Sequence, residues 1–207
     1  DLPERNVDAA CQVAHAISTN RVTMEIDYFT AVDDLLPEDT MGADMIGTVE
    51  FNSACYYRYA NVHIEGLVRN LQDDRDLAAT ALEAFLRAAI RAIPTGKQNT
   101  FAAHNPPSLV FGVVRRDASC NLANAFVSPA RPGEECDLVQ DSIRKLDAYW
   151  ARLTAMYGVD GIVGGWVVTS EPDFVSALAA EPSQSVPTVD ALVQGMLSAS
   201  GLNGGGR

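Results

Sequence analysis

Hydrophobic and polar residues alternate in two stretches near the start of the chain. Every second position is apolar or aromatic in each stretch, which is the pattern of a half-buried β-strand. The positions that share a face in residues 9–18 are Cys11, Val13, His15 and Ile17. The corresponding positions in residues 48–59 are Val49, Phe51, Cys55, Tyr57 and Tyr59, with Glu50, Asn52 and Arg58 on the opposite face. We predict one core strand in each stretch, with His15 as a buried core residue.

The two predicted strands are separated by about thirty residues that are rich in acids and show little periodicity. A connection this long inside a compact domain is typical of a functional loop or of disorder. It carries Tyr28 and Phe29, followed by Met41, Met45 and Ile46. Such side chains either anchor the loop on its own domain or stack on nucleic-acid bases. The residues alone leave both interpretations open.

Helical periodicity dominates the rest of the chain. Residues 74–93 have an apolar stripe with Asp73 or Asp74 as a cap, and residues 137–157 have another that ends at Gly158. Short apolar runs predict strands at 109–114 and 162–169, and a last helix is expected near 188–198. This order predicts an α+β sandwich in which helices cover one face of a sheet.

Composition narrows the possible functions. A net charge of −12 and a pI near 4.5 count against a stand-alone nucleic-acid binder, because phosphate contacts need local Lys and Arg. The four cysteines are scattered without metal-ligand spacing, which favours free thiols. No long apolar run or secretory signal is present, so we expect a cytoplasmic protein without a membrane partner.

Two segments carry candidate chemistry. Gly96 and Lys97 do not form a phosphate-binding P-loop, because position 91 is Arg and position 98 is Gln. Lys97 and Gln98 are then either donors to phosphate oxygens or part of an ordinary polar loop. Asp33 and Asp34 belong to the only carboxylate cluster, which suggests a metal-dependent ribonuclease as an alternative to a solvated acidic loop. We predict no catalytic residue, metal or cofactor.

Several long segments resemble one known family, in the order of that family and over nearly the whole chain. They are QVAHAIST (12–19), FTAVDDL (29–35), GTVEFNSACYYRYANV (47–62), GKQNTFAAHNP (96–106), LANAF (122–126) and DAYWARLTAMYG (147–158). On these residues the chain is similar to the CasC backbone subunits of the type I-E CRISPR Cascade complex, within the repeat-associated (RAMP) group.

The resemblance implies a fold and a domain organisation. It indicates the C-terminal part of an RRM-like, ferredoxin-like palm over residues 1–200, incomplete because family members carry a further N-terminal portion. Residues of about 20 to 50 would be the thumb, and residues 201–207 a flexible tail.

The resemblance also implies a function without catalysis. Subunits of this family bind the guide RNA (crRNA), polymerise along its spacer as a helical filament of identical copies, contact other Cascade subunits and present the guide to target DNA. Each thumb displaces one RNA base. By this resemblance the RNA-binding residues are Tyr28, Phe29, Thr30 and Ile46 on the thumb, with Lys97 and Gln98 at the RNA backbone.

Overall fold

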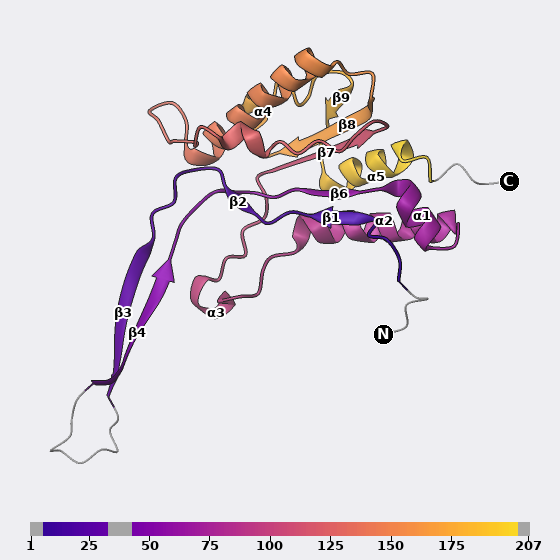
Figure 1. Cartoon of the computed structure of the whole chain (residues 1–207). Coiled ribbons are helices and arrows are strands. Elements are labelled where there is room, and N and C mark those ends of the chain that lie inside the picture. Colours follow the sequence, from indigo (N-terminus) through magenta and orange to yellow (C-terminus); the bar gives the residue numbers. More distant parts are fainter. Residues whose placement is uncertain (1–5, 33–42, 203–207) are drawn as a thin grey trace.

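The chain folds as a mixed α+β structure from which one hairpin projects (Figure 1). The computed structural model describes residues 6–32 and 43–202. Within these ranges the strands are β1 (Cys11–Val13), β2 (Ile17–Ser18), β3 (Glu25–Val32), β4 (Ala43–Phe51), β5 (Tyr56–Tyr57), β6 (Ala60–Val62), β7 (Leu109–Arg115), β8 (Ile162–Thr169) and β9 (Ser183–Ser185). The helices are α1 (Ile64–Asn70), α2 (Arg75–Arg91), α3 (Gln98–Phe101), α4 (Leu138–Tyr157) and α5 (Val189–Ala199), with 3-10 turns η3 (Ala123–Phe126) and η4 (Pro172–Phe174).

The sheet β7-β8-β9 forms the middle layer of the body and is covered on both faces. Strand β8 pairs antiparallel with β7 and parallel with β9. Neighbouring residues of β8 enter opposite cores: Val167 packs with α4, and Trp166 packs with α2 and α5. On the α4 side, Phe111 and Trp150 make an edge-to-face pair with ring centroids 5.1 Å apart. The prediction that helices cover only one face of the sheet is therefore wrong. Strand β8 is a nearly continuous apolar run, which is the pattern of a strand that is buried on both faces.

The three predicted helices are present as α2, α4 and α5, with ends within two residues of those predicted. Helix α2 follows Asp74, whose carboxylate accepts a hydrogen bond from the Leu77 backbone N–H at 2.9 Å. Helix α4 begins with a reciprocal capping box between Asp137 and Gln140, and it ends at Gly158, which has a φ of 77°. These ends are set locally, which is why the sequence predicts them well.

The first predicted strand is only partly correct. Residues 9–18 form two short strands, β1 and β2, which pair antiparallel with β6 and β5. Their side chains are mostly exposed, with Val13 at 70%, and His15 is exposed where a core histidine was predicted. The alternation was real, but no described layer packs over this face. Periodicity reveals which residues share a face, not whether another element covers it.

The second predicted strand, over residues 48–59, is broken into two pieces, the end of β4 and the short strand β5. Strand β4 ends at Phe51, and β5 and β6 follow after a bend. The predicted alternation is nevertheless confirmed, because Tyr57 and Tyr59 are half-buried and Arg58 between them is exposed.

The predicted irregular loop is instead a long antiparallel hairpin of β3 and β4, which projects from the body (Figure 1). The described side chains of β3 are exposed on both faces, so burial imposes no hydrophobic alternation on this arm. In β4, Val49 and Phe51 are half-buried and Glu50 between them is exposed, which is the alternation that the sequence shows. Residues 33–42, which include the acidic cluster of Asp33 and Asp34, lie outside the described residues, as do residues 203–207 of the predicted tail.

All four cysteines are free thiols, as predicted. Among the described helices, none combines the length and the apolar character that crossing a membrane requires.

Candidate nucleic-acid interface

The root of the hairpin is fixed to the body by Thr19 and Asn20. The Thr19 backbone N–H donates to the Cys55 carbonyl at 2.9 Å, and the Asn20 carboxamide oxygen accepts from the Cys55 backbone N–H at 3.0 Å. Thr19 is 3% exposed, and its hydroxyl lies 2.8 Å from that of Ser142 on α4. These contacts join the incoming and outgoing arms to each other and to the body, so the direction of the hairpin is set at its root.

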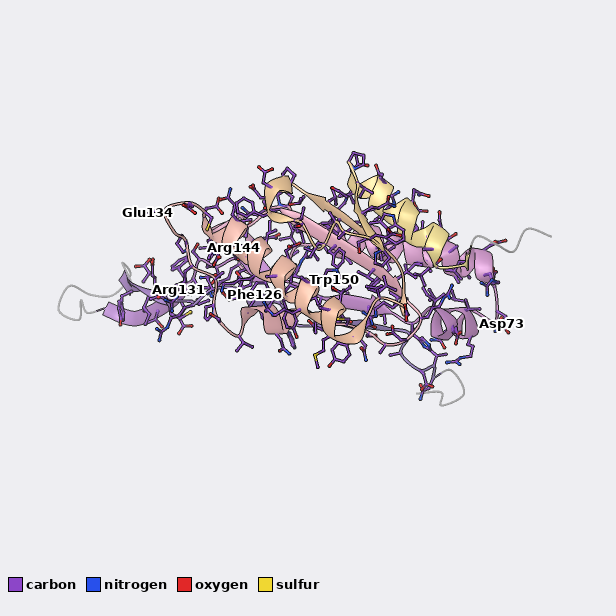
Figure 2. All side chains as sticks on the ribbon, turned by 90° about the horizontal axis from the view of Figure 1, so that it is seen from above. Asp73, Phe126, Arg131, Glu134, Arg144 and Trp150 are labelled. Carbon is purple, nitrogen blue, oxygen red and sulfur yellow. The ribbon has the colours of Figure 1, made fainter. Side chains whose placement is uncertain are left out.

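A second clamp joins the root to the segment before α4. The Ala130 backbone N–H donates to the Thr19 carbonyl at 2.8 Å, and the Arg131 backbone N–H donates to the Asp141 carboxylate at 2.9 Å. Figure 2 shows Arg131 and Arg144 beside this junction. Burial of Asp141 opposes its charge, but the hydrogen bonds from the Arg131 backbone and the Arg144 guanidinium outweigh burial and hold its pKa below the usual range.

Tyr57 supports the same junction from β5. Its hydroxyl donates to the Asn121 carboxamide oxygen at 3.1 Å and accepts from the Leu122 backbone N–H at 3.0 Å. Burial raises the pKa of Tyr57 from 10.0 to about 12, so the phenol stays protonated, and able to donate, well above neutral pH.

The register of the hairpin assigns the predicted thumb residues to two faces. Thr30 lies opposite Ile46, and Tyr28 lies opposite Thr48, so these positions share one face. Phe29 lies opposite Gly47 on the other face. The pair of Glu25 with Phe51 lies on this same face, four residues away along each strand. Tyr28 is 69% exposed, whereas the side chains of Phe29, Thr30 and Ile46 lie outside the described part of the chain.

The predicted phosphate-binding turn lies beside Glu50 and Phe51, at the end of β4, which we call the foot of the hairpin. Lys97 and Gln98 are exposed, and Gln98 opens the one-turn helix α3. The Lys97 ammonium group donates to the Glu50 carbonyl of β4 at 3.3 Å. Because Phe51 packs on Phe101 of α3, the turn lies on the side of the hairpin to which position 29 belongs. Lys97 and Gln98 therefore lie on the side of the hairpin that carries position 29, and position 28 is on the opposite face.

Sequence reasoning missed the residues that hold this turn. The Arg58 guanidinium donates to the carbonyls of Ile90 and Ala92 at 3.0 and 2.6 Å, and so caps the C-terminal end of α2 just before the turn. Its place on the polar side of a strand was visible, but its partners are more than thirty residues away. Phe51 and Phe101 were missed for the same reason.

Charge is unevenly distributed around the hairpin. The described exposed acids of the two arms are Glu25, Asp27 and Glu50, whereas Lys97 supplies a cation at the foot. Acidic arms repel phosphate, so any phosphate contact is favoured at the foot rather than along the ribbon.

The described residues contain no cluster of three or more His, Cys, Asp or Glu side chains that could hold a metal ion. Two shallow surface hollows lie away from the hairpin, one between α2 and α5 and one beside the C-terminal end of α4. Asp33 and Asp34 lie outside the described residues.

Comparisons with known proteins agree on one relationship. A family model described as CT1975-like protein matches residues 1–195. A chain of a solved structure named "CRISPR RNA-guided surveillance complex, pre-nicking" is 35% identical, with a TM-score of 0.80 over 96% of this chain and 52% of that chain. A chain of a "CRISPR RNA-guided surveillance complex" is 34% identical, with a TM-score of 0.81 over 97% of this chain and 74% of that chain. The chain thus spans about half the length of the first of these relatives. Curated proteins give no match.

Proposed function

Because the chain belongs to the CT1975-like protein family, we propose that it is a non-catalytic subunit that binds guide RNA in a CRISPR surveillance complex. The observation that carries this proposal is the match of 96% of the chain, at 35% identity and a TM-score of 0.80, to a chain of an RNA-guided surveillance complex. Its partners are the crRNA, further copies of the same chain and other Cascade subunits, and it reaches target DNA through the guide.

In this proposal the body is an RRM-like, ferredoxin-like palm and the hairpin β3–β4 is its thumb. The hairpin suits this role because it projects from the body and is held firmly only at its root, by Thr19 and Asn20. A projecting ribbon can cross over an RNA strand that lies along the body. Copies arranged along the spacer would hold the guide in segments, ready for pairing with DNA.

The proposed contacts are independent of RNA sequence. Phe29 would press against a displaced base near the crossing from one face of the ribbon, and Thr30 and Ile46 would do so from the other face, which they share with Tyr28. Lys97 and Gln98 would hold the RNA backbone at the foot, where the turn is exposed. Stacking and phosphate contacts accept any base, so sequence is read by pairing between guide and target.

The test is binding of a guide RNA to the 207-residue chain over a series of salt concentrations, with and without Mg²⁺. We expect discrete complexes of increasing size on longer guides, an affinity that falls linearly with the logarithm of salt concentration, and intact RNA. Failure of the wild-type chain to bind any RNA would contradict the proposal for this chain.

The ribonuclease built on Asp33 and Asp34 predicts a different result in the same experiment. RNA would then be cleaved only when Mg²⁺ is present, and the double variant Asp33→Asn, Asp34→Asn would abolish cleavage. Under our proposal this variant leaves the RNA intact and changes binding only slightly, through the loss of two negative charges.

A further inference from the structure

A half-exposed aromatic ring stands beside Lys97 at the foot of the hairpin. Phe101 is 37% exposed, and its ring centroid lies 5.2 Å from that of Phe51 with the two planes tilted by 42°. The Lys97 ammonium group lies 6.0 Å from the centre of the Phe101 ring. Phe51 thus packs against the Phe101 ring, which remains partly exposed and lies close to the positive charge of Lys97.

The backbone holds Lys97 and Phe101 on one side of a single helical turn. The Phe101 backbone N–H donates to the Lys97 carbonyl at 3.0 Å, so residues four apart lie one above the other. Lys97 and Ala102, at the two ends of the turn, have left-handed φ values of 52° and 46°. Left-handed backbone in residues other than glycine costs free energy and often marks functional sites.

The present contacts of Lys97 are weak enough to exchange. Its hydrogen bond to the Glu50 carbonyl is 3.3 Å long, and its distance to the Phe101 ring is at the limit of a cation–π contact. A phosphate offers a charge-assisted hydrogen bond that is stronger than either. When the ammonium group moves to a phosphate, the ring of Phe101 becomes more accessible.

We infer that Phe101 is a platform for an unpaired nucleobase, while Lys97 binds the phosphate of the same nucleotide. Phe51 acts as a positioning residue, because it fixes the ring and ties it to the hairpin. The inference rests on the proposed RNA binding and adds a base contact at the foot, which is separate from the contacts expected farther along the hairpin. The ligand class is single-stranded RNA of any sequence, since every base has a face that can stack.

The experiment compares a short oligouridine with an oligonucleotide of the same length that lacks bases. Loss of stacking costs about 1 to 3 kcal/mol, so Phe101→Ala and Phe101→Leu should weaken binding of the oligouridine by about five-fold to 150-fold. Neither variant should change binding of the abasic strand. Lys97→Gln should weaken binding of both strands, because both carry phosphates. The leucine variant keeps an apolar contact with Phe51 and so separates stacking from simple support of the hairpin.

A fluorescence readout reports stacking directly. Both natural tryptophans are buried, Trp150 at 3% exposure and Trp166 at 9%, so a tryptophan introduced by Phe101→Trp would be the exposed one. Its emission should be quenched by the oligouridine and not by the abasic strand. The matched control is Tyr157→Trp, at a residue that is 73% exposed at the end of α4, where neither strand should quench.

The outcomes separate the two proposals. If wild type binds the oligouridine and Phe101→Leu binds it equally well, the stacking inference is wrong and the RNA-binding function stands. If the leucine variant loses as much affinity for the abasic strand as for the oligouridine, Phe101 acts only by supporting the hairpin, which also overturns the inference. If wild type binds neither strand, the proposed function itself fails for this chain, and the inference fails with it.

Discussion

The body and the hairpin differ in how each is held. In the body, Val167 is completely buried and Trp150 is 3% exposed, with helices on both faces of the sheet. In the hairpin, Tyr28 is 69% exposed and Ile26 is 52% exposed. A two-stranded ribbon is marginally stable by itself, so the hairpin depends on its root. The stability of the fold therefore comes mainly from the body, and the exposed side chains of the hairpin are available for contacts with a partner.

The largest effect is expected in the body. Trp150→Ala removes the edge-to-face partner of Phe111 and opens a cavity between α4 and the sheet, which should cost about 3 to 5 kcal/mol of unfolding free energy. Urea denaturation measures this loss. The control is Tyr157→Ala on the same helix, which is 73% exposed and should change stability by about 0.5 kcal/mol or less. Equal losses in the two variants would show that α4 is not part of the main core.

A smaller and pH-dependent effect is expected at the junction. Asp141 has a pKa below its usual value in the folded protein, so its contribution is complete above the unfolded value of 3.8 and is lost as pH falls through the folded value. Asp141→Asn should therefore destabilise the protein by about 1 to 3 kcal/mol at pH 7. The gap to wild type should close in melts at progressively lower pH. A gap that does not narrow as the pH falls below 3.8 would mean that packing, not charge, causes the loss.

Substitutions on the hairpin should change binding and spare stability. Phe29→Ala should leave the melting temperature within a few degrees of wild type and weaken assembly on guide RNA by about 1 kcal/mol or more, if the ring meets a base. Tyr28→Ala should weaken assembly less, because its position is on the face away from Lys97. Gel-shift titration and thermal melts of both variants measure the two quantities. A large fall in melting temperature for Phe29→Ala would instead show that the ring anchors the hairpin.

The smallest effect is expected from a single charge at the foot. Lys97→Gln should lower the slope of log affinity against log salt concentration by about 0.7, the value for one phosphate contact on a single strand. Arg69→Gln removes one exposed positive charge on α1, far from the hairpin in Figure 1, and should leave the slope unchanged. Identical changes in both variants would mean that Lys97 acts only through the total charge of the chain.

Part of the candidate site could be predicted from the sequence. Gly96, Lys97 and Gln98 are adjacent in the chain, so an exposed polar turn was expected there, and the structure confirms the exposure. The partners of that turn could not be predicted. Phe51 and Phe101 are fifty residues apart in the chain, and Arg58 donates to the carbonyls of Ile90 and Ala92, which are more than thirty residues away. The family resemblance suggested a thumb, but it did not assign Phe29 and Tyr28 to opposite faces.

Most helices and strands of the body could be predicted from the sequence, because their signals are local. A cap such as Asp137, a terminating glycine such as Gly158 and an apolar stripe act within a few residues, and burial on the sheet imposes the periodicity that reveals them. The hairpin, its two faces and the exposure of His15 are seen only in the folded structure. Those features depend on which distant segments meet and on what covers them, for example Thr19 against Ser142. The period of a strand says nothing about either.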